Sequence, residues 1–224
     1  MKLVHVAASP RGGASESARI AETFIDALSD ACPDVEIDTW NLWDGTLPAF
    51  GPAAAAAKMA VFAGNEPEAE EAAAWLAARA AFDRLSAADC HLFSVPMWNH
   101  GIPYVLKQLI DVVSQPGMVF SFDAVNGYTG LLTDKKAVVI YTSAVYGDGL
   151  DPRFGSDFQA PYLDAWLRWA GVNDVTPVFF RPNLVTGDAD ASREAAQAAA
   201  RAAAAVLSEA HCTGAWTRRH RAAS

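Results

Sequence analysis

A short apolar run that ends at a proline and leads into an amphipathic helix constrains this chain most. His91–Val95 (HLFSV) has the composition of a buried central strand, and Pro96 ends the run. Beyond the loop MWNH, apolar residues recur at helical spacing from Ile102 to Val113. A strand, a tight loop and a helix in this order place the loop at the carboxyl edge of a parallel sheet, where open α/β folds bind ligands. An ordinary strand-to-helix connection is the alternative.

The same order of elements recurs along the chain and predicts one doubly wound α/β domain. Strands are expected at Leu3–Ala8, Val35–Leu42, His91–Val95, Lys136–Thr142 and Asp174–Phe180, with helical patterns between them. The expected sheet is parallel, five-stranded and ordered 2-1-3-4-5, with Pro177 indicating an edge position for the last strand. Residues 1–210 would form this domain and residues 211–224 a C-terminal tail. The segments 44–66 and 115–133 read as inserted loops, the first with one short helix.

Composition and charge exclude several classes of protein. The chain has 224 residues, 52% of them hydrophobic, and a net charge of −9, which argues for a globular protein and against nucleic acid or an anionic membrane as a partner. The cysteines at 32, 90 and 212 are scattered, which favours neither a disulfide framework nor a zinc site and fits a reducing cytoplasm. No run approaches the roughly 20 apolar residues of a membrane helix. No cluster of metal ligands has a convincing spacing, so no metal is predicted.

The stretch SPRGGASES follows the first strand and precedes a helical pattern. Ser15 or Ser17 is a suitable N-cap, and a helix N-terminus offers unpaired N–H groups and a positive dipole end to a phosphate. Ser9 and Arg11 add donors. The stretch is neither G-x-G-x-x-G nor a Walker loop, so it suits a phosphate monoester such as that of FMN. A polar turn with an N-cap is the alternative.

In the strand order 2-1-3-4-5, the loops after strands one, three and four meet around one crevice. The serines of the first loop would hold a phosphate. Residues 97–100 and 142–146 would hold a flat ring from two sides. FMN fits this division, and its own ring carries the redox chemistry, so the protein need not supply an acid–base pair.

Four motifs carry a resemblance to a known family. They are the serine-containing start, VPMWN followed by IPYVLKQLID, then KKAVVIYTS, and PYLDAWL before GV. With them the chain resembles the FMN-dependent NADH:quinone oxidoreductases, also called azoreductases, which have a flavodoxin-like fold. The similarity covers nearly the whole chain.

The resemblance implies FMN as cofactor, NADH or NADPH as co-substrate, a quinone or azo compound as acceptor, and a homodimer. It implies that Ser9 and residues 15–17 bind the phosphate, that residues 97–100 line the isoalloxazine, and that 142–145 lie at its pyrimidine edge. Trp98 and His100 stand where the family has Tyr and Phe, and the strand-four loop lacks the family's R-G-G. The resemblance and the composition of the three loops together give the candidate cofactor-binding residues. They are Ser9, Arg11, Ser15, Glu16, Ser17, Pro96, Met97, Trp98, Asn99, His100, Thr142, Ser143, Ala144, Val145 and Tyr146.

No residue is assigned a certain catalytic role. His100 is the one histidine considered for chemistry, as a hydrogen-bond or proton donor near the ring, and a loop histidine that only packs or faces solvent is the favoured alternative. The competing function is a flavodoxin-type electron carrier, which binds FMN but does not oxidise NADH itself. A domain that has lost its cofactor is a third possibility. For the homodimer, the sequence adds that the helices 102–113 and 160–170 carry more apolar surface than one sheet face can cover.

Overall fold

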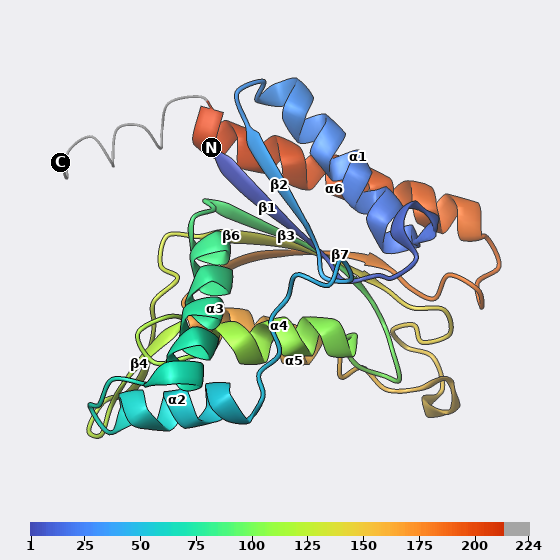
Figure 1. Cartoon of the computed structure of the whole chain (residues 1–224). Coiled ribbons are helices and arrows are strands. Elements are labelled where there is room, and N and C mark those ends of the chain that lie inside the picture. The colour runs from blue at the N-terminus through green and yellow to red at the C-terminus, as the bar shows by residue number, and fades with distance from the viewer. Residues whose placement is uncertain (213–224) are drawn as a thin grey trace.

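The computed structural model describes residues 1–212, and its central sheet has five parallel strands in the order β2-β1-β3-β6-β7 (Figure 1). This confirms the predicted fold class and strand order. Because β7 is an edge strand, Pro177 costs the sheet no ladder hydrogen bond on its open side. Apart from its first two residues, which belong to the last helix, the expected tail 211–224 lies outside the described residues. The strand bounds are β1 Lys2–Ala7, β2 Glu36–Asn41, β3 Cys90–Pro96, β6 Lys136–Thr142 and β7 Asp174–Phe180.

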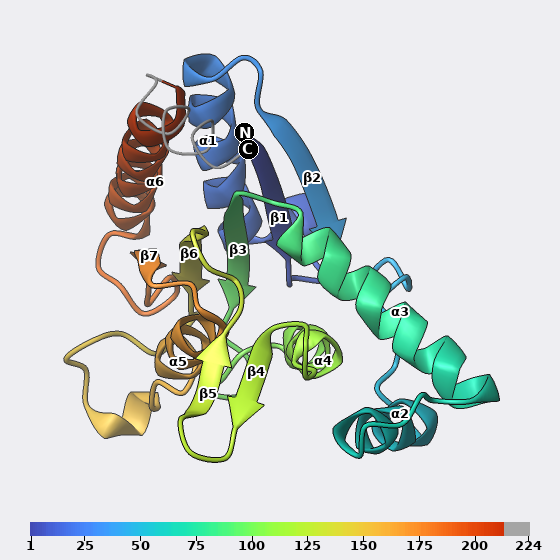
Figure 2. The ribbon, with the colours of Figure 1, turned by 90° about the vertical axis from the view of Figure 1, so that its left-hand side faces the viewer.

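Helices cover both faces of the sheet, and two separate apolar cores result. Helices α1 and α6 lie side by side on one face, whereas α3, α4 and α5 cover the other (Figures 1 and 2). The interior strands β3 and β6 are buried on both faces, which explains why they read as almost continuous apolar runs. The helix bounds are α1 Glu16–Ala31, α2 Pro52–Phe62, α3 Ala69–Ser86, α4 Tyr104–Val113, α5 Ala160–Ala170 and α6 Ala189–Cys212, with short 3₁₀ turns at Gly12–Ala14 and Pro152–Phe154.

The first insertion holds the one helix that its sequence predicts, and the second contains more regular structure than its sequence indicates. The first holds α2, which packs beside α3 (Figure 2). The second, expected as an irregular loop, forms a two-stranded antiparallel hairpin of β4 (Phe120–Asp123) and β5 (Gly127–Gly130). Its turn spans residues 124–126, and Gly127, with φ +79°, begins β5. The hairpin lies against α5 so closely that a Cβ atom on Gly130 would be 2.3 Å from the backbone nitrogen of Gly171.

The apolar surface of α4 is buried within the monomer. Val105, Leu106, Leu109 and Ile110 are at most 5% exposed. The segment that leads into the hairpin, with Met118 at 0% exposure, belongs to the same core. The inserted segment thus covers the stripe of α4 that was expected to need a second subunit, and Tyr104, 64% exposed, is the large side chain of α4 that stays open to solvent.

Two cysteines differ in state. Cys90 is free and buried, and burial raises the pKa of its thiol to about 12. Cys32 is disulfide-bonded, which the scattered cysteines did not predict. Among the described residues, no helix combines the length and the apolar character needed to cross a membrane.

Candidate cofactor site

A cleft of about 370 Å³ lies at the carboxyl edge of the sheet, between the loops that follow β1, β3 and β6. Most of the predicted site residues line it. They are Ser9, Arg11, Ser15, Glu16, Pro96, Met97, Trp98, Thr142, Ser143 and Ala144. The cleft also has walls that the sequence did not indicate, formed by Pro10 and Ala14, by Asn183 and Leu184 after β7, and by Arg193 of α6. Ser17, Asn99, His100, Val145 and Tyr146 are not among its lining residues.

The N-terminus of α1 opens into this cleft without a side-chain cap. Ser15 occupies the N-cap position, but its hydroxyl makes no capping hydrogen bond and instead pairs with the Ser17 hydroxyl at 3.0 Å. The N–H groups of a first helical turn have no intrahelical acceptor, so they remain available to an anion in the cleft. A Cβ atom at Gly12 or Gly13 would meet nothing within 4 Å, which shows that the loop before the helix borders open space. This surface fits a phosphate group.

Charged side chains surround the same helix end. The Glu16 carboxylate accepts hydrogen bonds from Arg193, from Nε at 2.9 Å and from Nη2 at 3.2 Å, and lies 3.6 Å from Nη1 of Arg19. Glu16 and Arg193 are 177 residues apart in the chain. No local pattern in the sequence links them, which is why Arg193 was missed.

The loop after β3 makes a tight turn over Trp98–Gly101. Trp98 and Gly101 exchange reciprocal backbone hydrogen bonds of 2.9 Å, and the central residues Asn99 and His100 have φ values of +47° and +70°. Two successive positive φ values are the signature of a type I′ turn. The N–H of Met97 donates to the carbonyl of Thr142 at 2.7 Å, which ties this loop to the one after β6.

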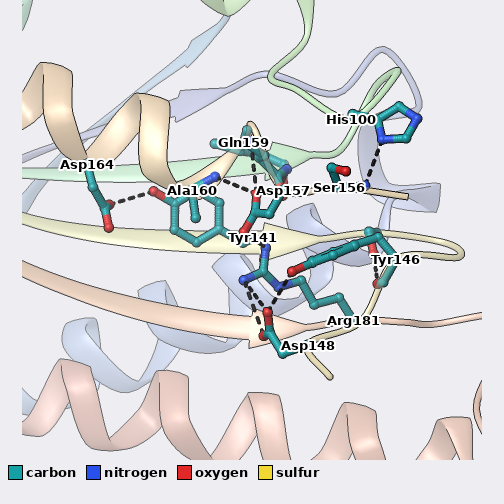
Figure 3. Close-up of polar contacts among 12 residues, drawn as sticks. His100, Tyr141, Tyr146, Asp148, Ser156, Asp157, Gln159, Ala160, Asp164 and Arg181 are labelled. Carbon is teal, nitrogen blue, oxygen red and sulfur yellow. Dashed lines mark hydrogen bonds and ion pairs between the residues drawn. The ribbon is translucent and has the colours of Figure 1, made fainter. Parts of the chain in front are cut away.

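His100 is held by the segment that precedes α5. Its Nδ1 accepts a hydrogen bond from the N–H of Ser156 at 2.9 Å, and its carbonyl accepts one from Phe158 at 2.9 Å (Figure 3). With Nδ1 acting as acceptor, the neutral ring carries its proton on Nε2. A chemical role for His100 therefore stays a prediction that concerns Nε2 alone.

The loop after β6, which lacks the R-G-G of the family pattern, is held in place by a nearly buried arginine. The Arg181 side chain is 4% exposed, and its guanidinium pairs with Asp157 at 2.7 Å and with Asp148 at 3.3 Å (Figure 3). It also lies over the rings of Tyr146, at 5.1 Å, and Phe179, at 4.3 Å. Arg181 thus joins the end of β7 to the β6 loop and to the start of α5.

The other members of this network hold α5 and the phenol of Tyr146. Asp157 accepts from the N–H groups of Gln159 and Ala160 at 2.9 and 3.0 Å and so caps α5. Gln159 donates to the carbonyl of Val95, at the end of β3. Desolvation and then the hydrogen bond to Asp148 raise the pKa of Tyr146, so its phenol stays protonated and donates to that carboxylate.

A second, larger and more apolar cavity of about 770 Å³ adjoins the first at Trp98. Aromatic rings form much of its wall, with an ion pair between Lys107 and Asp111 on one side. Asn99, which does not line the cleft, lines this cavity instead. The aromatic residues are Phe50, Trp98, Tyr104, Phe158 and Tyr162.

Comparison with known proteins supports a family assignment. A family described by its flavodoxin-like fold matches residues 1–206. An "FMN-dependent NADH:quinone oxidoreductase" of Ruegeria pomeroyi is 45% identical over 202 residues, which cover 90% of this chain and 99% of that protein. The chain belongs to the FMN-dependent NADH:quinone oxidoreductase family. A relative of the same name from Desulfotalea psychrophila is 37% identical over 93% of this chain and 96% of its own length.

Solved structures share the fold of this oxidoreductase family member. An azoreductase from Bacillus anthracis superposes with a TM-score of 0.83 at 23% identity, covering 91% of this chain and 98% of that one. An FMN-dependent NADH-azoreductase of the same species, solved in complex with FMN, gives 0.83 at 21% identity, covering 92% and 99%. At these identities the likeness concerns the fold alone.

Proposed function

We propose that this protein is an FMN-dependent oxidoreductase that transfers two electrons from NADH or NADPH to quinones and to azo compounds. One observation carries the proposal: three loops of a flavodoxin-like sheet enclose a cleft into which the uncapped N-terminus of α1 opens. The cleft lies within the range of roughly 300–1,000 Å³ typical of small-molecule sites. The names of the relatives state the same activity and support this proposal.

The residues of the cleft divide into two groups by what they can hold. Ser9, Ser15 and the first N–H groups of α1 would hold the phosphate. Residues 96–98 and 142–144 would orient the isoalloxazine from two sides, linked by the bond between Met97 and Thr142. Bound FMN would supply the hydride and electron chemistry. Ser17 is fully buried beneath Ser15 and would act by orienting the Ser15 hydroxyl.

The aromatic cavity beside Trp98 is the proposed acceptor site. Flat apolar compounds such as quinones bind well between aromatic side chains because such rings stack and exclude water. Trp98 lines both spaces, so it would lie between the cofactor and the acceptor. The carboxylate of Asp111 is paired with Lys107, which leaves this wall close to neutral.

Purified protein should be yellow and should release FMN, not FAD, on denaturation. With a soluble quinone it should oxidise NADH directly, because the cleft and the acceptor cavity adjoin in one chain. The absorption spectrum and a stopped assay of NADH consumption test this. A protein that binds FMN but needs a separate reductase is an electron carrier, and a protein that cannot be loaded with FMN contradicts the proposal.

We further propose a homodimer whose second subunit closes the acceptor cavity. At the rim of this cavity Tyr104 is 64% and Phe158 66% exposed, and a second subunit packed there would cover both rings. Light scattering at micromolar concentration should give about 48 kDa, twice the 23.8 kDa of the chain. A monomer with full NADH:quinone activity would contradict this assignment.

Residues 1–210 are proposed to act as a single FMN-binding domain. A cytoplasmic location stays a prediction from the sequence, and the disulfide bond at Cys32 is more typical of an oxidising compartment.

A further inference from the structure

A carboxylate stands at the helix end that is proposed to receive a phosphate. Glu16 is the first residue of α1 and lines the cleft together with Ser15. Acidic side chains stabilise a helix N-terminus, but a fixed negative charge there repels a dianionic ligand at the same place. The carboxylate therefore needs a compensating cation before the cleft can favour a phosphate.

Arg193 supplies that cation from the other side of the cleft. Helices α1 and α6 pack side by side (Figures 1 and 2). Arg193 near the start of α6 makes a two-pronged contact with Glu16, at 2.9 and 3.2 Å. The two side chains are only 28% and 21% exposed, so water screens the pair less than at an open surface. Phe180 lies beneath the guanidinium at 5.5 Å.

All three nitrogens of the guanidinium are already engaged. Nε and Nη2 bond to Glu16, and Nη1 bonds to Asp190 at 2.5 Å. These bonds use three of the five guanidinium N–H groups, so a direct phosphate contact would fall to the second N–H of Nη1 or Nη2, each on a nitrogen already held by a carboxylate. The geometry thus favours charge compensation over direct phosphate binding.

We propose that Arg193 is a positioning residue that neutralises Glu16 and thereby allows the cleft to prefer FMN over riboflavin, which lacks the phosphate. This inference rests on the proposed function, since it takes the N-terminus of α1 as the phosphate site. It assigns to α6 a role in cofactor selection.

A double-mutant cycle with two flavins tests the inference. FMN and riboflavin affinities are measured by quenching of flavin fluorescence for the wild type, Arg193→Met, Glu16→Gln and the double variant. Arg193→Met should weaken FMN binding about 10- to 100-fold and leave riboflavin binding within about twofold, because Glu16 would keep only the longer contact with Arg19, at 3.6 Å, and only FMN carries the charge that this carboxylate repels. Glu16→Gln should bind FMN at least as tightly as the wild type. The double variant should return to within about threefold of the wild type.

Two further variants serve as controls. Arg201→Met makes the same change on an exposed position of α6 and should alter neither affinity. Ser15→Ala should reduce FMN affinity and not riboflavin affinity, which checks that the phosphate binds at α1. Equal losses for both flavins in Arg193→Met would overturn the inference in favour of a purely structural role. A double variant as weak as Arg193→Met would overturn it in favour of a direct phosphate contact. If the wild type binds neither flavin, the proposed function itself fails.

Discussion

Replacement of Arg181 by Met is expected to lower the free energy of unfolding by about 3–5 kcal/mol, the cost of removing one partner from a buried ion pair. The side chain is 4% exposed, and Asp157, which it neutralises, is 13% exposed. Without Arg181, the largely buried Asp157 carboxylate loses its cationic partner. Tyr146 and Phe179 also lose the cation that lies over their rings. Urea unfolding followed by tryptophan fluorescence measures the change.

A matched surface substitution isolates the effect of burial. Arg153 also pairs with an aspartate, Asp151, but its side chain is 85% exposed. Arg153→Met should change the free energy of unfolding by no more than about 0.5 kcal/mol, because water screens such pairs. If the two Arg→Met variants lose similar stability, the Arg181 network does not hold the site loops as the contacts indicate.

Acid should destabilise the protein well before its carboxylates become protonated. Burial lowers the pKa of His5 and of His91 from 6.5 to about 4. Above pH 6.5 both histidines are neutral in the folded and unfolded states, so they cause no pH dependence there. Between pH 6.5 and 4 only the unfolded chain takes up their protons, and stability falls by about 3 kcal/mol for each histidine. Urea midpoints at pH 7, 5.5 and 4.5 follow this loss.

A substitution that cannot titrate separates the histidines from other groups. His5 lies in β1, 3.0 Å from the hydroxyl of Ser94, and His5→Gln keeps a hydrogen-bonding group there without a titratable proton. The fall in stability between pH 6.5 and 4 should shrink by about half. The pKa values of Asp38 and Asp151 are lowered from 3.8 by their arginine partners, so the stability they contribute is lost only below about pH 4. An unchanged fall in His5→Gln would show that other groups control acid unfolding.

The sequence by itself determined the sheet and the main loops of the site. The strands β6 and β7 occupy the predicted ranges, Lys136–Thr142 and Asp174–Phe180. Apolar runs bounded by Gly, Pro and Ser are a local signal, because a strand covered by helices on both faces admits few polar residues. Since parallel strands end at one edge, their order alone brings the serine loop and the VPMWN loop together.

Tertiary structure decided the features that depend on distant partners. The segment that leads into the hairpin, with Met118 and Val119, joins the core of α4 and covers apolar surface that the helical pattern alone assigned to a second subunit. Glu16 and Arg193 meet only because α1 and α6 pack on the same face of the sheet. His100 meets Ser156 only because the fold places the segment before α5 beside the loop after β3, where Ser156 and Phe158 both donate to His100. Periodicity specifies which face of an element is buried, but not which other element covers it, since that is settled by the packing of the whole domain.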